Sequence, residues 1–172
     1  GRFQLVEVKS GKKIVYSSSK RDLRKEYDEA TGEEILSRPF KGVERLELHF
    51  LTPTRFESDA KPSSKIDFST IIRNLIQRIS LLSYFHCGEE IGGDMRGMVE
   101  RAKQIALESS ELSWYDWERF PKKQRKKLKL GGFIGVATFS GNLDEFIPYL
   151  SIGELVHIGK GASFGLGRYR FR

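Results

Sequence analysis

Hydrophobic and polar positions follow two different periods along this chain, and the change from one to the other marks the expected elements. Between positions 46 and 51 apolar residues alternate with more polar ones, which predicts a strand with one buried face that ends at Pro53. Helical spacing then predicts one helix capped by Asp67 and stopping near Gly88, and a second one capped by Asp94 and reaching Ala106.

The second half of the chain returns to strand patterns. The aromatic stretch LSWYDWERF at 112–120 predicts a strand, and GGFIGVATF at 131–139 predicts its antiparallel partner. Asn142 and Glu145 have the spacing of a capping box, and Pro148 interrupts the helix that they introduce, so we expect its main part from about Pro148 to His157. FGLGRYRF at 164–171 then predicts a closing strand.

The first 43 residues have a looser pattern. Residues 2–17 predict a hairpin that turns at Ser10 and Gly11, and a short helix is expected around Arg21–Tyr27 in a charged connector. We therefore predict a hairpin and connector over 1–43 and one domain over 44–172. Because no methionine stands at the start and a strand begins at once, we also expect this chain to be a fragment of a longer protein.

From position 44 onward the expected order is strand, helical pair, strand, strand, helix, strand. This βαββαβ order predicts a ferredoxin-like α+β fold, an antiparallel sheet with helices on one face. Its other face is open, and proteins of this architecture use that face for RNA, although the fold also carries many unrelated activities.

Positive charge is concentrated at the C-terminal end. Residues 119–172 hold 11 Lys and Arg against 3 Asp and Glu, whereas the whole chain has a net charge of +7. Much of this charge lies in RFPKKQRKKLK at 119–129, between two expected strands. Such a block can be a nuclear-import signal, a solvated segment or a nucleic-acid contact. We predict a hairpin tip that contacts an RNA backbone through Lys122, Lys123, Arg125, Lys126 and Lys127.

A glycine-rich segment, HIGKGASFGLGRYRFR, ends the chain. Glycine lets backbone N–H groups approach a ligand, and a lysine among glycines favours an anion. No helix follows, which excludes the common nucleotide-binding loops, and the segment lacks the aromatic pattern of an RNA-recognition motif. The predicted RNA-binding residues here are Gly159, Lys160, Gly161, Gly165, Gly167 and Arg168. The glycines also have a structural interpretation, as turns packed closely against the sheet.

Other candidate residues carry weaker signals. His157 is a weak catalytic candidate that would also suit the C-terminal end of a helix, His49 is expected to point outward from its strand, and His86 has no supporting neighbour. Cys87 is expected to be a buried thiol at a helix end, and a single cysteine excludes an internal disulfide. One of two alternating sets, Trp114 or Tyr115 with Trp117, should face the open side of the sheet.

Several classes of protein do not fit the sequence. No run of eighteen apolar residues and no secretory signal are present, so we expect no membrane partner and a cytoplasmic location. Neither a zinc-ligand pattern nor a cofactor motif occurs, so no metal and no cofactor are expected.

Four stretches in register carry a family resemblance: LHFLTPTRF at 48–56, WYDWERF at 114–120, GGFIGVATFSGNLDEFIPYL at 131–150 and GELVHIGKGASFGLGRYRF at 153–171. With them the chain resembles the C-terminal domain of the CRISPR-associated endoribonuclease that cuts precursor CRISPR RNA within its repeats. The resemblance covers about 44–172 and includes the glycine-rich loop of the CRISPR repeat-associated protein superfamily.

The resemblance implies a mechanism and partners. Family members are similar in having two ferredoxin-like domains that hold CRISPR repeat RNA, and in cutting it without a metal through attack of a ribose 2′-OH on the adjacent phosphate. The general base is usually a histidine of the N-terminal domain, so we do not expect this chain to cut RNA by itself. The implied partners are repeat RNA, that N-terminal domain and, as further partners, CRISPR effector subunits. An exposed docking surface would also permit self-association.

The sequence leaves two alternatives open. One is a non-catalytic RNA-binding subunit of a CRISPR effector complex. The other is a ferredoxin-like interaction domain that binds no nucleic acid.

Overall fold

The structure is a computed structural model, and it describes residues 4–10, 12–20, 22–24, 31, 34–35, 40–56, 66–116, 118–119, 128–129 and 131–172. The chain divides into two compact units, Gly1–Ser37 and Arg38–Arg172.

The first unit contains a small antiparallel sheet, with strands β1 (Glu7–Ser10), β2 (Lys13–Ser17) and β3 (Asp22–Leu23) in that order. The hairpin predicted here is confirmed, because Ser10 pairs with Lys13 across the turn. The short helix expected around 21–27 is wrong for Asp22 and Leu23, which pair with Ser17 and Tyr16. Their backbone pairs with the neighbouring strand β2, and such tertiary pairing overrides a weak local helix preference.

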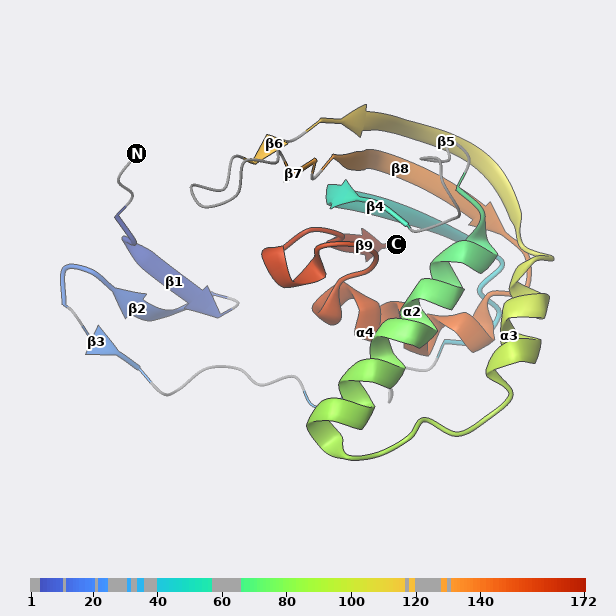
Figure 1. The fold of residues 1–172 in the computed structure, drawn as a ribbon, viewed down its shortest axis with the longest axis horizontal. Coiled ribbons are helices and arrows are strands. Elements are labelled where there is room, and N and C mark those ends of the chain that lie inside the picture. Colours follow the sequence, from blue (N-terminus) through green and yellow to red (C-terminus); the bar gives the residue numbers. More distant parts are fainter. Residues whose placement is uncertain are drawn as a thin grey trace. The chain divides into compact units, whose positions relative to one another are not determined.

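The second unit contains one four-stranded antiparallel sheet covered by helices. Strands β4 (Arg45–Thr54), β5 (Ala106–Tyr115), β8 (Gly132–Ser140) and β9 (Tyr169–Phe171) lie in the order β5-β8-β4-β9. Helices α2 (Phe68–Leu82), α3 (Met95–Ala102) and α4 (Ile147–Val156) lie on one side of the sheet (Figure 1). The predicted ferredoxin-like fold is confirmed, and no described helix of this unit covers the opposite face of the sheet.

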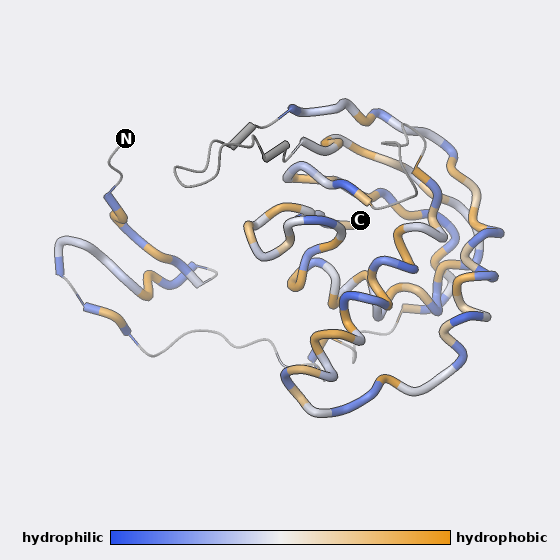
Figure 2. Tube along the Cα trace, in the orientation of Figure 1, coloured by the Kyte–Doolittle hydropathy of each residue, from blue (hydrophilic) through white to orange (hydrophobic). Residues whose placement is uncertain are grey.

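Helix α2 begins where the sequence predicts. The Asp67 carboxylate accepts a hydrogen bond from the Thr70 backbone N–H at 2.7 Å. Burial alone would raise the pKa of Asp67, but the hydrogen bonds from Ser69 and Thr70 outweigh it and the pKa is lowered. Hydrophobic and hydrophilic residues alternate along this helix (Figure 2), so that its apolar stripe faces the sheet.

The end of α2 corrects one expectation about Cys87. After Leu82 the chain makes a π-helical turn, Ser83–Cys87, which Gly88 ends in the left-handed conformation with φ 73°. Cys87 is exposed rather than buried. The reason is that this turn lies beyond the stretch of α2 that packs in the core, and its residues from Tyr84 onward are all exposed.

Helix α3 is shorter than its hydrophobic pattern suggests. Asp94 caps it as predicted, accepting from the Gly97 N–H at 2.8 Å, but it ends at Ala102 rather than Ala106. Ala106 already pairs with Ser140 as the first residue of β5. In the sequence, apolar residues at the end of a helix look the same as apolar residues at the start of a strand. Only the strand pairing shows where the helix ends and the strand begins.

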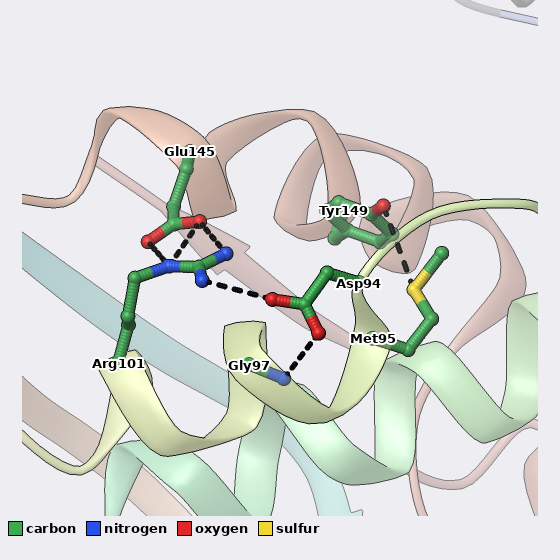
Figure 3. A network of polar contacts seen from close by, with 6 residues as sticks. All are labelled: Asp94, Met95, Gly97, Arg101, Glu145 and Tyr149. Carbon is green, nitrogen blue, oxygen red and sulfur yellow. Dashed lines mark hydrogen bonds and ion pairs between the residues drawn. The ribbon is translucent and has the colours of Figure 1, made fainter.

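The capping box expected at Asn142 and Glu145 does not form. A 3-10 turn, Asp144–Phe146, precedes α4 and has no side-chain cap. Hydrogen bonds from the backbone N–H groups of Gly42 (2.9 Å) and Val43 (2.8 Å) hold the Asp144 carboxylate and lower its pKa. Glu145 instead binds Arg101 of α3, which also contacts Asp94 (Figure 3). These acidic groups therefore tie α4 to its neighbours.

The hydrophobic core lies between sheet and helices. Leu46, Leu48 and Phe50 of β4 face it, as the alternation predicts, and they meet the inner faces of α2, α4 and β8. Tyr169 of β9 is 1% exposed, and its hydroxyl donates to the Leu150 backbone carbonyl at 2.8 Å. A side chain at Gly153 would overlap this hydroxyl, so the glycine admits β9 close to α4. Burial, followed by the charge of Glu154, raises the pKa of Tyr169.

Removing the buried hydroxyl provides a test of this packing. Tyr169→Phe is expected to lower the free energy of unfolding by about 1 kcal/mol, the usual net value of one intramolecular hydrogen bond. Urea unfolding followed by circular dichroism measures the change. The matched control is Tyr149→Phe, whose hydroxyl has only a 3.9 Å contact with the Met95 sulfur, so it should have almost no effect. An equal loss from both variants would contradict the assignment.

Candidate nucleic-acid interface

The glycine-rich segment leaves α4 through an unusual backbone conformation. His157 has φ 62° and ψ 171°, and among the described residues it is the non-glycine residue with positive φ. Its N–H donates to Gly153 O at 2.9 Å, and its Nδ1 lies 3.2 Å from Leu166 O. Because a carbonyl oxygen only accepts, Nδ1 carries the proton in this contact. The side chain therefore closes the loop.

The loop docks on the C-terminal end of β4. Ile158 N donates to Gly167 O (3.0 Å), which closes the base of the loop, and Gly167 N donates to Pro53 O (3.1 Å). Lys160 N donates to Arg55 O at 2.9 Å. These bonds join the last segment of the chain to a strand more than a hundred residues earlier.

The glycines of the loop serve close packing as well as turn geometry. All four have φ between 71° and 83°. A Cβ at Gly159 would lie 2.5 Å from Arg55 O, and one at Gly167 would overlap Ile158 O. Gly165 has no atom within 4 Å of that position. The structural interpretation of these glycines is thus confirmed at 159 and 167.

The backbone amides of the loop are largely engaged inside the protein. The N–H groups of residues 158, 160 and 164–168 all donate to protein oxygens. A cradle that used all the loop amides for a phosphate is therefore excluded in this conformation. RNA contacts at Gly159, Gly161, Gly165 and Gly167 stay predictions, as does the one at exposed Lys160.

A row of arginines follows the loop. Arg168, Arg170 and Arg172 are exposed and alternate with Tyr169 and Phe171, which face the core. Arg170 pairs in register with His49, so the row lies on the open face at the sheet edge. Within the described part of the chain, no ion-pair partner neutralises these three guanidinium groups. We call them the arginine row.

The arginine row lines a groove of about 390 Å³ at the edge of β9, together with His49, Leu51, Glu154, Leu155 and Phe171. The Glu154 carboxylate accepts from the Phe171 N–H at 2.9 Å, which covers the outer edge of this strand. His49 points outward as predicted, and its Nε2 lies 3.4 Å from Glu47 Oε2. This contact lacks hydrogen-bond geometry.

The rest of the open face differs in charge. Arg45 forms ion pairs with Glu47 at 3.3 Å and with Glu108 at 3.1 Å, so its charge is compensated across strands β4 and β5. Glu111 of β5 adds a further carboxylate on the same face, opposite Val136. Among the described residues, the uncompensated positive charge of the open face therefore lies at the β9 edge, and an anionic ligand is favoured there.

The basic block is only partly covered by the structure. Strands β6 (Glu118–Arg119) and β7 (Leu128–Lys129) pair antiparallel, which agrees with a hairpin at this place. The predicted contact residues of its tip lie outside the described residues, namely Lys122, Lys123, Arg125, Lys126 and Lys127. The same holds for Trp117.

The neighbouring aromatic residues are placed by their strand pairing. Trp114 pairs with Phe133 of the core and so lies on the helix side, whereas Tyr115 lies on the open side and is 51% exposed. His86 is exposed in the turn after α2. In the described part of the chain, no three His, Cys, Asp or Glu side chains come together as a metal site, and no helix is long and apolar enough to cross a membrane.

Sequence reasoning missed Arg170 and Arg172 as site residues. Their signal was present, because RYRFR alternates basic and aromatic residues with the period of a strand. The compensation of Arg45 carried no such signal, since its partner Glu108 lies on another strand.

Fold and site together define a ferredoxin-like domain with a C-terminal glycine-rich loop docked on its first strand and a basic row at the sheet edge. The model of one protein family, the CRISPR-associated endoribonuclease Cas6, matches residues 48–169. The chain belongs to the Cas6 family.

Solved structures agree on the fold. Thermus thermophilus Cas6 (TTHB231) superimposes with a TM-score of 0.63 at 17% identity, over 83% of this chain and 58% of that one. A product complex of Cas6 (TTHB231) gives a TM-score of 0.61 at 16% identity, over 84% and 56%. A partial Cas6-RT-Cas1–Cas2 complex gives 0.60 at 13%, over 89% and 28%. This chain thus spans less than two thirds of each. No curated protein matches it.

Proposed function

We propose that this chain is the RNA-binding C-terminal domain of an endoribonuclease that processes precursor CRISPR RNA by metal-independent cleavage within repeats. The observation that carries the proposal is the arginine row, three exposed guanidinium groups without an ion-pair partner among the described residues, next to the docked glycine loop of a Cas6 family member. Guanidinium groups bind phosphate oxygens in a planar, two-point arrangement, which suits an RNA backbone.

The chemistry assigned to this reaction needs three kinds of group. A base takes the proton of the ribose 2′-OH, an acid protonates the leaving oxygen, and cations stabilise the negative charge on the non-bridging phosphate oxygens in the transition state. This chain supplies cations from the arginine row, from Lys160 and from the basic hairpin. His157 is engaged with Leu166 O through Nδ1, and we assign it to loop closure.

We assign the general base to a second, N-terminal ferredoxin-like domain. Binding and proton transfer are then divided between two domains, with the repeat RNA held against the open face of this one. CRISPR effector subunits and a second copy of this chain are further partners under this proposal.

The test measures binding and cleavage separately. A fluorescein-labelled RNA hairpin with a single-stranded flank is titrated with the purified chain at several salt concentrations, and the RNA is then run on a denaturing gel. We expect binding that weakens steeply with salt, because phosphate contacts release counterions, and we expect the RNA to stay intact.

Each alternative gives a different result. No binding at low salt would refute the proposal and favour an interaction domain that binds no nucleic acid. Cleavage by this chain alone would refute the assignment of the base to another domain. Binding that persists while a two-domain form also leaves the RNA intact would favour the non-catalytic subunit.

A further inference from the structure

The position of Arg168 depends on more than strand pairing. In the regular ladder β9 pairs with β4 only at Leu48, His49 and Phe50, so Arg168 lies beyond the last paired residue, Tyr169. On the other side of β4 the pairing with β8 is irregular between Phe50 and Thr54. Arg168 therefore follows the glycine loop at a place where the regular pairing of β4 with β9 has ended and that of β4 with β8 is irregular.

One hydroxyl group of β4 holds Arg168 beyond the regular ladder. Thr52 Oγ1 accepts a hydrogen bond from Arg168 N at 2.9 Å and donates one to Gly165 O at 3.1 Å. A hydroxyl has one proton and two acceptor sites, so both bonds form at once. The Arg168 carbonyl in turn accepts from the backbone N–H groups of Leu51 (2.8 Å) and Thr52 (3.3 Å). Both backbone polar groups of Arg168 are thus fixed by this part of β4.

The other bonds that join residues 51–55 to the loop and to Arg168 are backbone bonds, made by the N–H groups of Leu51 and Thr52 and by the carbonyls of Pro53 and Arg55, and they do not depend on side-chain type. Among the described residues, the side-chain hydrogen bonds that join β4 to the loop both belong to Thr52. The residues on either side of this link, Gly165 and Gly167, have φ of 83° and 71°. Glycine has a wide range of conformations, so without the link the Arg168 N–H loses its acceptor and the position of Arg168 depends on the remaining backbone bonds.

We propose that Thr52 is a positioning residue for RNA binding, whose hydroxyl holds Arg168 at the head of the arginine row. The proposal rests on the proposed function, because it assigns to Arg168 a phosphate of the bound RNA. Arg170 and Arg172 keep their places through the β4 ladder when the hydroxyl is removed. The effect of Thr52 should therefore pass through Arg168 alone.

A double-mutant cycle tests this coupling. Thr52→Val removes the hydroxyl and keeps a branched side chain, whereas Thr52→Ser keeps the hydroxyl. Each is made with Arg168 intact and with Arg168→Gln, and fluorescence anisotropy measures affinity for the labelled RNA hairpin. We expect Thr52→Val to weaken binding roughly three- to tenfold, the cost of ordering one long side chain on binding expressed as a ratio. Thr52→Ser should stay within about twofold of wild type, since both bonds remain.

In the Arg168→Gln background, Thr52→Val should cause no further loss. A matched control is Thr138→Val, in β8 opposite Glu47 toward the other end of β4, which should leave affinity unchanged. A merely structural role of Thr52 would weaken binding equally in both backgrounds, and that result would overturn the proposal. Unchanged binding by Thr52→Val would overturn it as well.

A second measurement does not depend on RNA. Hydrogen exchange of the Arg168 amide, followed by NMR, should become faster in Thr52→Val and stay slow in Thr52→Ser, because this amide is the donor to the hydroxyl. Equal protection in the two variants would overturn the proposal even where valine lowers stability. Failure of the wild-type chain to bind the RNA would refute the proposed function together with this inference, whereas wild-type binding without an effect of valine refutes the inference alone.

Discussion

Gly167→Ala is expected to lower the free energy of unfolding by about 2–5 kcal/mol, which is the largest single-residue effect that we predict. Two costs add at this position. Its φ of 71° is unfavourable for any residue with a Cβ, and the added carbon would overlap the Ile158 carbonyl. That carbonyl is part of the backbone at the base of the loop, so a change of side-chain rotamer cannot relieve the overlap.

Gly165 provides the matched control. Its φ of 83° is equally unfavourable, but no atom lies within 4 Å of an added Cβ. Gly165→Ala should therefore cost only about 1–2 kcal/mol, the conformational part alone. Urea unfolding of both variants, followed by circular dichroism, gives the comparison. Equal losses at the two sites would show that crowding at Ile158 does not limit this loop.

Replacing the arginine row is expected to have the largest effect on RNA binding. In the variant with Arg168, Arg170 and Arg172 all changed to glutamine, the slope of log affinity against log salt should decrease by about 2, because each phosphate contact with a single strand contributes about 0.7. The affinity at low salt should decrease accordingly. Glutamine keeps much of the aliphatic side chain, so the change is mainly one of charge.

Arg45→Gln is the control for this experiment. Arg45 lies on the same face and is exposed, but Glu47 and Glu108 compensate its charge. Its replacement should leave the salt slope unchanged. A triple variant with the wild-type slope, or an Arg45 variant with an equal decrease, would place the RNA elsewhere on the molecule.

Local pattern was sufficient for much of the fold. The alternation along β4 and the caps Asp67 and Asp94 depend on neighbouring residues in sequence, and they were predicted correctly. The predictions were wrong where a residue distant in sequence determines the local structure. Ala106 joins a strand because Ser140 offers a partner, and Asp144 binds the backbone of Gly42 and Val43 instead of leaving a cap to Asn142.

The candidate site shows the same division. The sequence determined that positive charge, glycines and a final strand-forming segment come together at the end of the chain, because composition and a two-residue period are local properties. Only the tertiary structure decided which of those groups are available to a ligand. Most of the loop amides are engaged within the loop or by residues 52–55, Arg45 is paired to another strand, and the arginine row is left exposed at an edge. Burial, charge compensation and hydrogen bonding depend on which distant segments meet, and this cannot be read from the order of residues alone.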